Sequence, residues 1–225
     1  MMDPNEVLDE AIGEGDLQRA REALSRGADP NKPVGVFERS PLIWAVHCGQ
    51  ADIVRLLLSS GSTVESEKKP QKDQTSLHVA VATGDLDMIR LLLEADGHVA
   101  LNTFDYVYRT PLMCAVESGH LEAARMLLQA GSDVNAHDEE HIGDTAVKLA
   151  VEKKDLAMVD LLLNAGADPT ILGWMGISTL NRVINDKDER EGMGLKKRLE
   201  EFCALKGLNP KDYLYPSKRR SKGKR

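Results

Sequence analysis

The sequence predicts an all-α solenoid, in which pairs of helices stack on one another along the chain. A phrase that begins with Ser or Thr recurs every 35 residues, and its four copies are SPLIWA from Ser40, TSLHVA from Thr75, TPLMCA from Thr110 and TAVKLA from Thr145. A leucine-rich triplet follows each copy, at residues 56–58, 91–93, 126–128 and 161–163. Self-similarity with a period of about 20 to 50 residues is typical of stacked repeats, which bury their apolar faces only against their neighbours.

The unit that begins at Thr110 shows how each repeat is expected to fold. Thr110 is suited to cap a helix by accepting a hydrogen bond from a free backbone amide, and Pro111 is suited to the first helical position. Apolar residues at helical spacing follow, and Gly119 is expected to end this short first helix. A second helix then runs to Gly131. Each unit is therefore predicted to be two antiparallel helices followed by an extended finger.

The turn between the two helices favours glycine. Gly49, Gly84 and Gly119 occupy this turn in three units, whereas Lys154 occupies it in the unit of Thr145. A non-glycine residue in the left-handed conformation costs on the order of 1 kcal/mol. We therefore expect the turn at Lys154 to be the weaker one.

The repeated phrases resemble the ankyrin repeat, whose pattern is T-P-L-H-x-A. TSLHVA and TPLMCA come closest to that pattern, and residues 27–31, 131–135 and 166–170 look like the G-A-D-V-N ending of the family. The resemblance implies an ankyrin-repeat solenoid of about six helix-turn-helix units with β-hairpin-like fingers, the outer two units serving as caps. It also implies that His78, at the histidine position of the pattern, makes a structural hydrogen bond between loops.

We assign residues 1–206 to the repeat domain, with units at about 3–35, 36–70, 71–105, 106–140, 141–173 and 174–206. The second helix of the last unit, expected from Leu195 to Leu205, is rich in charge, as a terminal repeat requires. Residues 207–225 form a C-terminal tail that we expect to be disordered unless bound. The last ten residues of the tail, 216–225, hold six basic residues, which are Lys218, Arg219, Arg220, Lys222, Lys224 and Arg225.

Charge and composition narrow the class of protein. The net charge is −7, and because residues 216–225 contribute six positive charges, residues 1–215 carry −13. No apolar run approaches the roughly 18 residues of a membrane span, and the N-terminus does not look like a signal peptide. Three widely spaced cysteines indicate reduced thiols. We therefore expect a monomeric cytoplasmic protein, or a nuclear one in a eukaryote, with no membrane association.

No catalytic residue, cofactor site or metal site is expected. The string HDEEH from His137 to His141 lacks a glutamate next to its first histidine and lies in a finger, so it is interpreted as a solvated loop. The glycine pairs at 13–15 and 192–194 follow no strand, and we interpret them as turns or helix caps. Cys48 and Cys114 are interpreted as buried or partly buried thiols within repeat helices. The sequence thus predicts a protein that is not an enzyme, since an active site needs convergent groups.

The fingers hold most of the aromatic residues. Five of the nine aromatic side chains lie just before a repeat phrase, namely Phe37, Phe104, Tyr106, Tyr108 and Trp174. Tyrosine and tryptophan are enriched at binding hot spots. The alternative is that these rings pack on adjacent fingers and seal the stack. Trp44 lies in a first helix and is interpreted as a core residue.

The resemblance implies a non-catalytic protein–protein interaction module, an adaptor or inhibitor, that grips a partner through a concave face of fingers and first-helix ends. The positions carried over are Phe37, Arg39, His47, Lys72, Tyr106, Tyr108, Arg109, Glu117, Ile142, Asp144, Trp174 and Met175. Arg39 and Arg109 are expected to pair with carboxylates of the partner. The alternative function is a nucleic-acid-associated or nuclear-imported protein that uses the basic tail. A tail that is merely solvated is the third interpretation.

Overall fold

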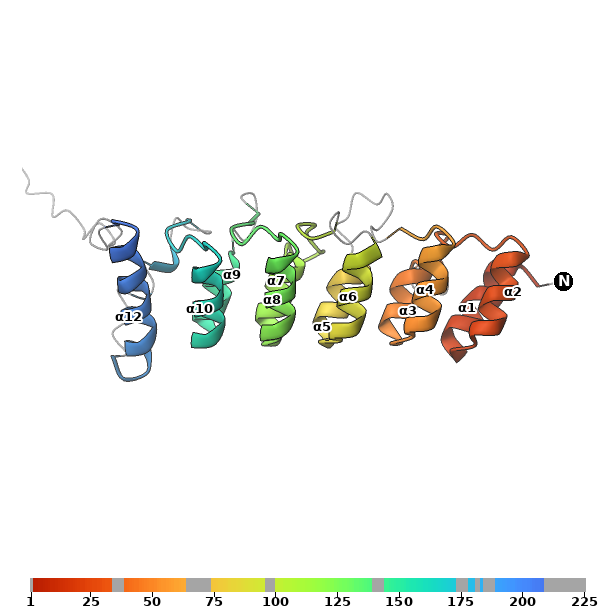
Figure 1. Ribbon diagram of the computed structural model, residues 1–225, viewed down its shortest axis with the longest axis horizontal. Helices are drawn as coiled ribbons and strands as arrows, with labels where there is room; N and C mark the ends of the chain where they lie inside the picture. The colour runs from red at the N-terminus through yellow and green to blue at the C-terminus, as the bar shows by residue number, and fades with distance from the viewer. Residues whose placement is uncertain are drawn as a thin grey trace, which may run out of the picture. The chain divides into compact units, whose positions relative to one another are not determined.

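The computed structural model describes residues 2–33, 39–63, 74–95, 100–138, 144–172, 178–180, 183 and 189–208. These residues form α-helices joined by turns and fingers (Figure 1), with an isolated antiparallel bridge between Leu172 and Ser178. The chain divides into two compact units, unit 1 with residues 1–133 and unit 2 with residues 134–225. The domain boundaries drawn from the sequence stay a prediction.

Unit 1 consists of stacked helix pairs. The pairs are α1 (Pro4–Glu14) with α2 (Leu17–Ser25), α3 (Pro41–His47) with α4 (Ala51–Ser59), α5 (Ser76–Thr83) with α6 (Leu86–Ala95), and α7 (Pro111–Ser118) with α8 (Leu121–Gln129). The first helices contact one another in chain order, and so do the second helices (Figure 1). Leu42, Leu77 and Leu112 from successive first helices are almost fully buried between the pairs. The predicted helical solenoid fold is therefore confirmed.

The first residue of each phrase caps its helix as predicted. The Ser40 hydroxyl accepts the Ile43 N–H at 3.2 Å, and the Thr110 hydroxyl accepts the Met113 N–H at 3.3 Å. In the turns that follow the first helices, Gly84 and Gly119 adopt the left-handed conformation with φ of 73° and 71°. A polar cap at one end and a glycine turn at the other therefore fix the length of each first helix.

Unit 2 contains α9 (Ala146–Glu152), α10 (Leu156–Asn164) and α12 (Glu189–Leu205). Lys154 has a φ of 58°, so a lysine does adopt the left-handed turn conformation that the repeat demands. Helix α12 begins earlier than the predicted Leu195 and includes Gly194, so the interpretation of residues 192–194 as a turn or cap is wrong. Gly194 serves helix packing instead, because a Cβ at this position would lie 3.2 Å from Leu156 Cδ1. A small residue allows α12 to approach α10 closely.

Asparagines at the ends of the repeats hold the next turn in place. In unit 1, Asn31 accepts the Thr63 N–H at 3.0 Å and donates to the Gly61 carbonyl at 2.9 Å. In unit 2, Asn135 accepts the Asp168 N–H at 2.7 Å and donates to the Gly166 carbonyl at 3.2 Å. These bonds fix the spacing at which successive fingers leave the stack.

Candidate partner-binding surface

The finger that precedes α7 forms a tight, preorganised turn. The Asp105 side chain is fully buried, and its Oδ1 accepts the N–H groups of Val107 at 3.0 Å and Arg109 at 2.9 Å. Tyr108 has a φ of 64°, which is uncommon for a bulky side chain. Tyr106, at the tip of this turn, is 61% exposed. The fold therefore presents an aromatic ring to solvent on a backbone that is already ordered.

Arg109 ties this finger to the helix behind it. Its Nε and Nη2 donate to Asp105 Oδ2 at 3.1 and 2.8 Å, and its Nη1 donates to Glu117 on α7. Burial alone would lower the pKa of Arg109, but the hydrogen bonds to Asp105 and Glu117 outweigh burial and raise the pKa above its ordinary value. The planar fork expected to bind carboxylates of a partner is thus engaged within the chain.

His78 connects α5 to the same finger. Its Nδ1 accepts the Thr75 N–H at 3.3 Å and lies 2.9 Å from the Thr75 hydroxyl, while its Nε2 donates to the Arg109 carbonyl at 2.9 Å. Burial lowers the pKa of this imidazole, which favours the neutral form that Nδ1 needs in order to accept the Thr75 N–H. The predicted structural hydrogen bond between loops is confirmed.

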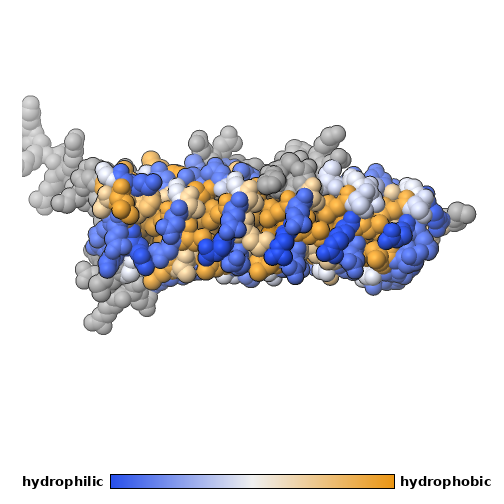
Figure 2. Space-filling view, in the orientation of Figure 1, coloured by the Kyte–Doolittle hydropathy of each residue, from blue (hydrophilic) through white to orange (hydrophobic). Residues whose placement is uncertain are grey.

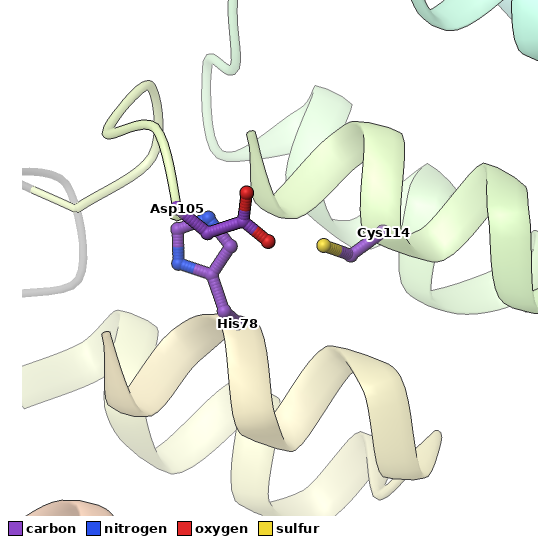
Figure 3. Close-up of side chains that lie close together, drawn as sticks. All are labelled: His78, Asp105 and Cys114. Atoms are coloured by element: carbon purple, nitrogen blue, oxygen red, sulfur yellow. The ribbon is translucent and has the colours of Figure 1, made fainter. Parts of the chain in front are cut away.

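His78, Asp105 and Cys114 place ligand atoms within 4.8 Å of one another (Figure 3), which raises the question of a metal site. Both nitrogens of His78 and both oxygens of Asp105 already have hydrogen-bond partners. Burial raises the pKa of Cys114 to about 12, whereas metals bind the thiolate. A cation would also have to displace the guanidinium of Arg109. The cluster is therefore better suited to hold α5, α7 and the finger together than to bind a metal.

Trp44 lies at the surface of α3, a position that was not predicted from the sequence. It is half-buried, and its ring stacks on the exposed His47 with centroids 5.8 Å apart and an angle of 17° between the planes. The interpretation of Trp44 as a core residue is therefore wrong. The helical register contains the missed signal, because the buried positions of α3 are Pro41, Leu42, Ala45 and Val46.

The predicted burial of Cys48 is also wrong. It is the exposed C-cap residue of α3, not a buried thiol within that helix, whereas Cys114 is buried as expected. Because the helix ends at His47, Cys48 lies beyond the last position that faces the core. The two cysteines thus differ in access because Cys114 lies within its phrase, whereas Cys48 lies three residues after the end of its own.

Unit 2 contains a similar finger contact. Lys148 pairs with Asp144, which precedes α9, and lies 3.9 Å from Glu152 Oε1 at the end of that helix. Lys148 is 35 residues after Met113 and 70 after His78, so it occupies the histidine position of its repeat. An ion pair here takes the place of the imidazole bridge of α5.

Several predicted positions fall outside the residues that the structure describes. These are Phe37, Lys72, Ile142, Trp174 and Met175, the residues 139–141 of the HDEEH string, and the tail residues Lys218, Arg219, Arg220, Lys222, Lys224 and Arg225. Among the others, Arg39 and Tyr108 are half-buried, while His47 is exposed. Below, the finger surface means the fingers of unit 1 together with the last turns of the first helices next to them. It carries Tyr106, Trp44, His47, Arg109 and Glu117.

The second helices of unit 1 present a different surface. Helices α4, α6 and α8 each carry an exposed ion pair three residues apart, Asp52 with Arg55, Asp87 with Arg90 and Glu122 with Arg125. Figure 2 shows hydrophilic bands over these helices with hydrophobic bands between them, and an open groove of about 650 Å³ lies between α6 and α8. Exposed pairs of this kind contribute little to stability. Among the described helices, none is long and apolar enough to cross a membrane.

Stacked helix pairs with ordered fingers define a repeat scaffold whose exposed surface is suited to hold another protein. The family model described as ankyrin repeats in three copies matches residues 8–105, 65–138 and 97–172, which together exceed half of the chain. The chain belongs to the ankyrin repeat family, whose fold is a protein–protein interaction module and is typically non-catalytic. The absence of enzymatic activity in this chain stays a prediction.

Two known proteins show how far the similarity reaches. The ankyrin repeat domain of Bcl-3, described as a unique member of the IkappaB protein family, matches with a TM-score of 0.77 and 26% sequence identity, over 92% of this chain and 89% of that chain. The 2-5A-dependent ribonuclease of Mus musculus is 36% identical over 69 residues, which is 31% of this chain. The match spans only 9% of the length of that ribonuclease.

Proposed function

We propose that this chain is an adaptor or inhibitor that binds another protein through its finger surface. The observation that carries the proposal is the Tyr106 finger, in which a ring that is 61% exposed stands on a turn held by a fully buried carboxylate. Holding a large side chain in place before binding reduces the entropy lost on association. Aromatic side chains on such a support are the usual hot spots of interfaces.

The Trp44–His47 pair supports the same proposal. Both side chains lie on α3, and His47 is the last residue of that helix, next to the turn. The stacked pair adds a second aromatic contact on unit 1, and the helices α3, α5 and α7 that carry the finger surface contact one another in sequence. Two separated anchors on one support favour an extended segment of a partner as the bound element.

Affinity purification followed by mass spectrometry tests the proposal. The wild-type chain is compared with a chain that carries Tyr106→Ala together with Trp44→Ala, and each recovered partner is then titrated against both. We expect the double variant to bind at least one partner about tenfold more weakly or worse, as is typical when hot-spot aromatics are truncated. Unchanged affinity for every partner would show that the finger surface is not the binding site.

Matched variants separate binding from folding. Leu205→Ala removes a side chain that is 86% exposed at the end of α12 in unit 2, outside the residues that make up the finger surface, so it is expected to leave binding unchanged. Tyr106→Phe keeps the ring and removes only the hydroxyl, so it is expected to retain most of the affinity. Equal losses in Leu205→Ala and Tyr106→Ala would point to a general effect on the fold.

The basic tail supports a second candidate function, that of a nucleic-acid-associated or nuclear-imported protein. The last ten residues hold six basic groups and no acidic ones, and such clusters release counterions from phosphates. This function predicts nucleic-acid binding that weakens steeply with salt and disappears when residues 216–225 are deleted. Binding that survives the deletion would eliminate it.

A further inference from the structure

The two aromatic anchors of the finger surface belong to repeats that are not adjacent. Trp44 lies on α3, whereas Tyr106 lies in the finger that leads into α7. Helix α5 contacts both α3 and α7, so it stands between the two anchors (Figure 1). All of these elements belong to unit 1. The stacking of three first helices therefore sets the separation of the anchors.

The geometry of helix packing gives the size of that separation. The axes of packed helices lie about 8–10 Å apart, so two steps along the stack, from α3 to α7, cover about 16–20 Å. Because the Tyr106 finger lies before the first residue of α7, the upper end of this range applies. An extended chain advances about 3.3 Å per residue and spans about 20 Å in roughly six residues. A helical segment, which rises about 1.5 Å per residue, needs roughly 13 residues.

Helix α5 carries smaller side chains than α3 at equivalent positions. Val79 follows Trp44 by 35 residues and is 8% exposed. Ala82 follows His47 by the same number of residues and is exposed, but its side chain is a single methyl group. A chain that runs from one anchor to the other can therefore lie close to α5 at these two positions.

The charged groups of the Tyr106 finger favour apolar contacts with a partner. Arg109 donates to Asp105 and to Glu117, and the Asp105 carboxylate also accepts two backbone N–H groups. A charged side chain of a partner would have to compete with these ion pairs. The exposed ring of Tyr106 and the half-buried ring of Trp44 instead offer large apolar faces.

We propose that the partner segment on the finger surface is extended and carries two large apolar side chains about six residues apart, one on Trp44 and one on Tyr106. The inference rests on the proposed function, because it specifies the partner segment that binds at the same surface. The first apolar side chain packs beside the Trp44–His47 stack, and the second packs on the Tyr106 ring. The spacing of the repeats thus selects the spacing of the two anchors in the partner.

A peptide selection on the full chain tests the spacing. A display library of about 16 random residues is long enough to hold the two anchors in either an extended or a helical segment, and it is selected on the immobilised wild-type chain. We expect the aligned sequences to show two enriched apolar positions about five to seven residues apart. A separation of about 13 residues, or apolar enrichment at every third or fourth position, would indicate a helix and overturn the extended segment.

Shortened versions of one selected peptide provide the matched comparison. Removing two residues from between the anchors shortens their reach by about 7 Å, whereas removing two residues from one end leaves both anchors in place. Measured by fluorescence anisotropy, the internal deletion should weaken binding about tenfold, the loss of one hot-spot contact, and the terminal deletion should have no effect. Equal affinities of the two shortened peptides would contradict a fixed spacing.

Variants of the chain assign each peptide anchor to its ring. Replacing one anchor by alanine should weaken binding to the wild-type chain but have little further effect on Tyr106→Ala, and the other anchor should show the same relation to Trp44→Ala. Because Trp44 is half-buried, circular dichroism checks the fold of each variant, and Trp44→Phe, which keeps a ring, should lose less affinity than Trp44→Ala. Arg125→Ala on α8 removes a side chain that is 45% exposed outside the finger surface and should have no effect. Losses that simply add for both anchors and both rings would contradict the assignment.

The outcomes separate a failure of this inference from a failure of the proposed function. Peptides with one enriched apolar position, or with another spacing, overturn the inference but leave the proposed function intact if Tyr106→Ala still weakens their binding. Peptides with the expected spacing that bind Tyr106→Ala and Trp44→Ala as tightly as the wild-type chain overturn both. A selection that yields no binder overturns the inference, because no short segment then suffices, whereas the proposed function still depends on the affinity purification.

Discussion

Replacing Asp105 with alanine should remove the main support of the α7 finger. The lost carboxylate is fully buried and accepts two backbone N–H groups and two N–H groups of Arg109, whose side chain is 28% exposed. Breaking a buried ion pair costs about 3–5 kcal/mol, but Arg109 is partly solvated and keeps Glu117, so about 2 kcal/mol applies here. The two backbone donors add about 1 kcal/mol. We therefore expect Asp105→Ala to lower the free energy of unfolding by about 3 kcal/mol.

Urea unfolding followed by circular dichroism measures this loss. With a slope of about 2 kcal/mol per molar urea, the midpoint should fall by about 1.5 M. Asp87→Ala is the control, because Asp87 also pairs with an arginine but its side chain is 91% exposed, and it should change stability by less than about 0.5 kcal/mol. If the two variants unfolded at the same urea concentration, the finger would not depend on Asp105 and the argument for a preorganised tip would fail.

Three further substitutions test how the repeats are held together. Gly84→Ala should destabilise the fold more than Gly119→Ala, by about 1 kcal/mol or more. Both glycines have nearly the same φ, but only a Cβ at Gly84 would meet another side chain, 2.8 Å from Cε1 of His120. Equal thermal midpoints of the two variants would contradict this expectation. Lys154→Gly should stabilise the chain by roughly 0.5–1 kcal/mol by relieving its left-handed backbone, and a loss of stability in urea would argue against strain there. The pKa of His78 in the folded chain lies below the value of 6.5 in the unfolded chain, so the unfolded state binds more protons at low pH. The stabilising contribution of neutral His78 is therefore fully present above pH 6.5. Below that pH the free energy of unfolding declines, by at most about 1.4 kcal/mol per pH unit. His78→Gln should flatten this decline, and an unchanged pH dependence of unfolding would rule out His78 as its source.

The repeat pattern was enough to predict most of the local structure. Thr110 as a helix cap, Gly119 as a left-handed turn and the unusual Lys154 in the same turn all follow from one repeated phrase, because each satisfies a backbone requirement that recurs in every unit. His78 could be placed for the same reason. Local chemistry that repeats along a sequence is predictable because the same residues meet the same neighbours.

Less of the candidate site could be predicted from the sequence. The role of Arg109 depends on the path of a finger that brings Asp105 and Glu117 around it, and spacing along the chain does not give that path. Trp44 required the register of a short helix with few buried positions, and Gly194 required knowledge of how closely α12 approaches Leu156. The roles of these side chains depend on neighbours in three dimensions and not on a repeated pattern, so the sequence alone did not predict them.

Amide hydrogen exchange on a complex with a partner recovered by affinity purification tests the finger surface most directly. We expect binding to slow exchange in residues 104–118, which contain the Tyr106 finger and α7, and in the last turn of α3. Slower exchange confined to α4, α6 and α8, on the surface of the second helices, would contradict it.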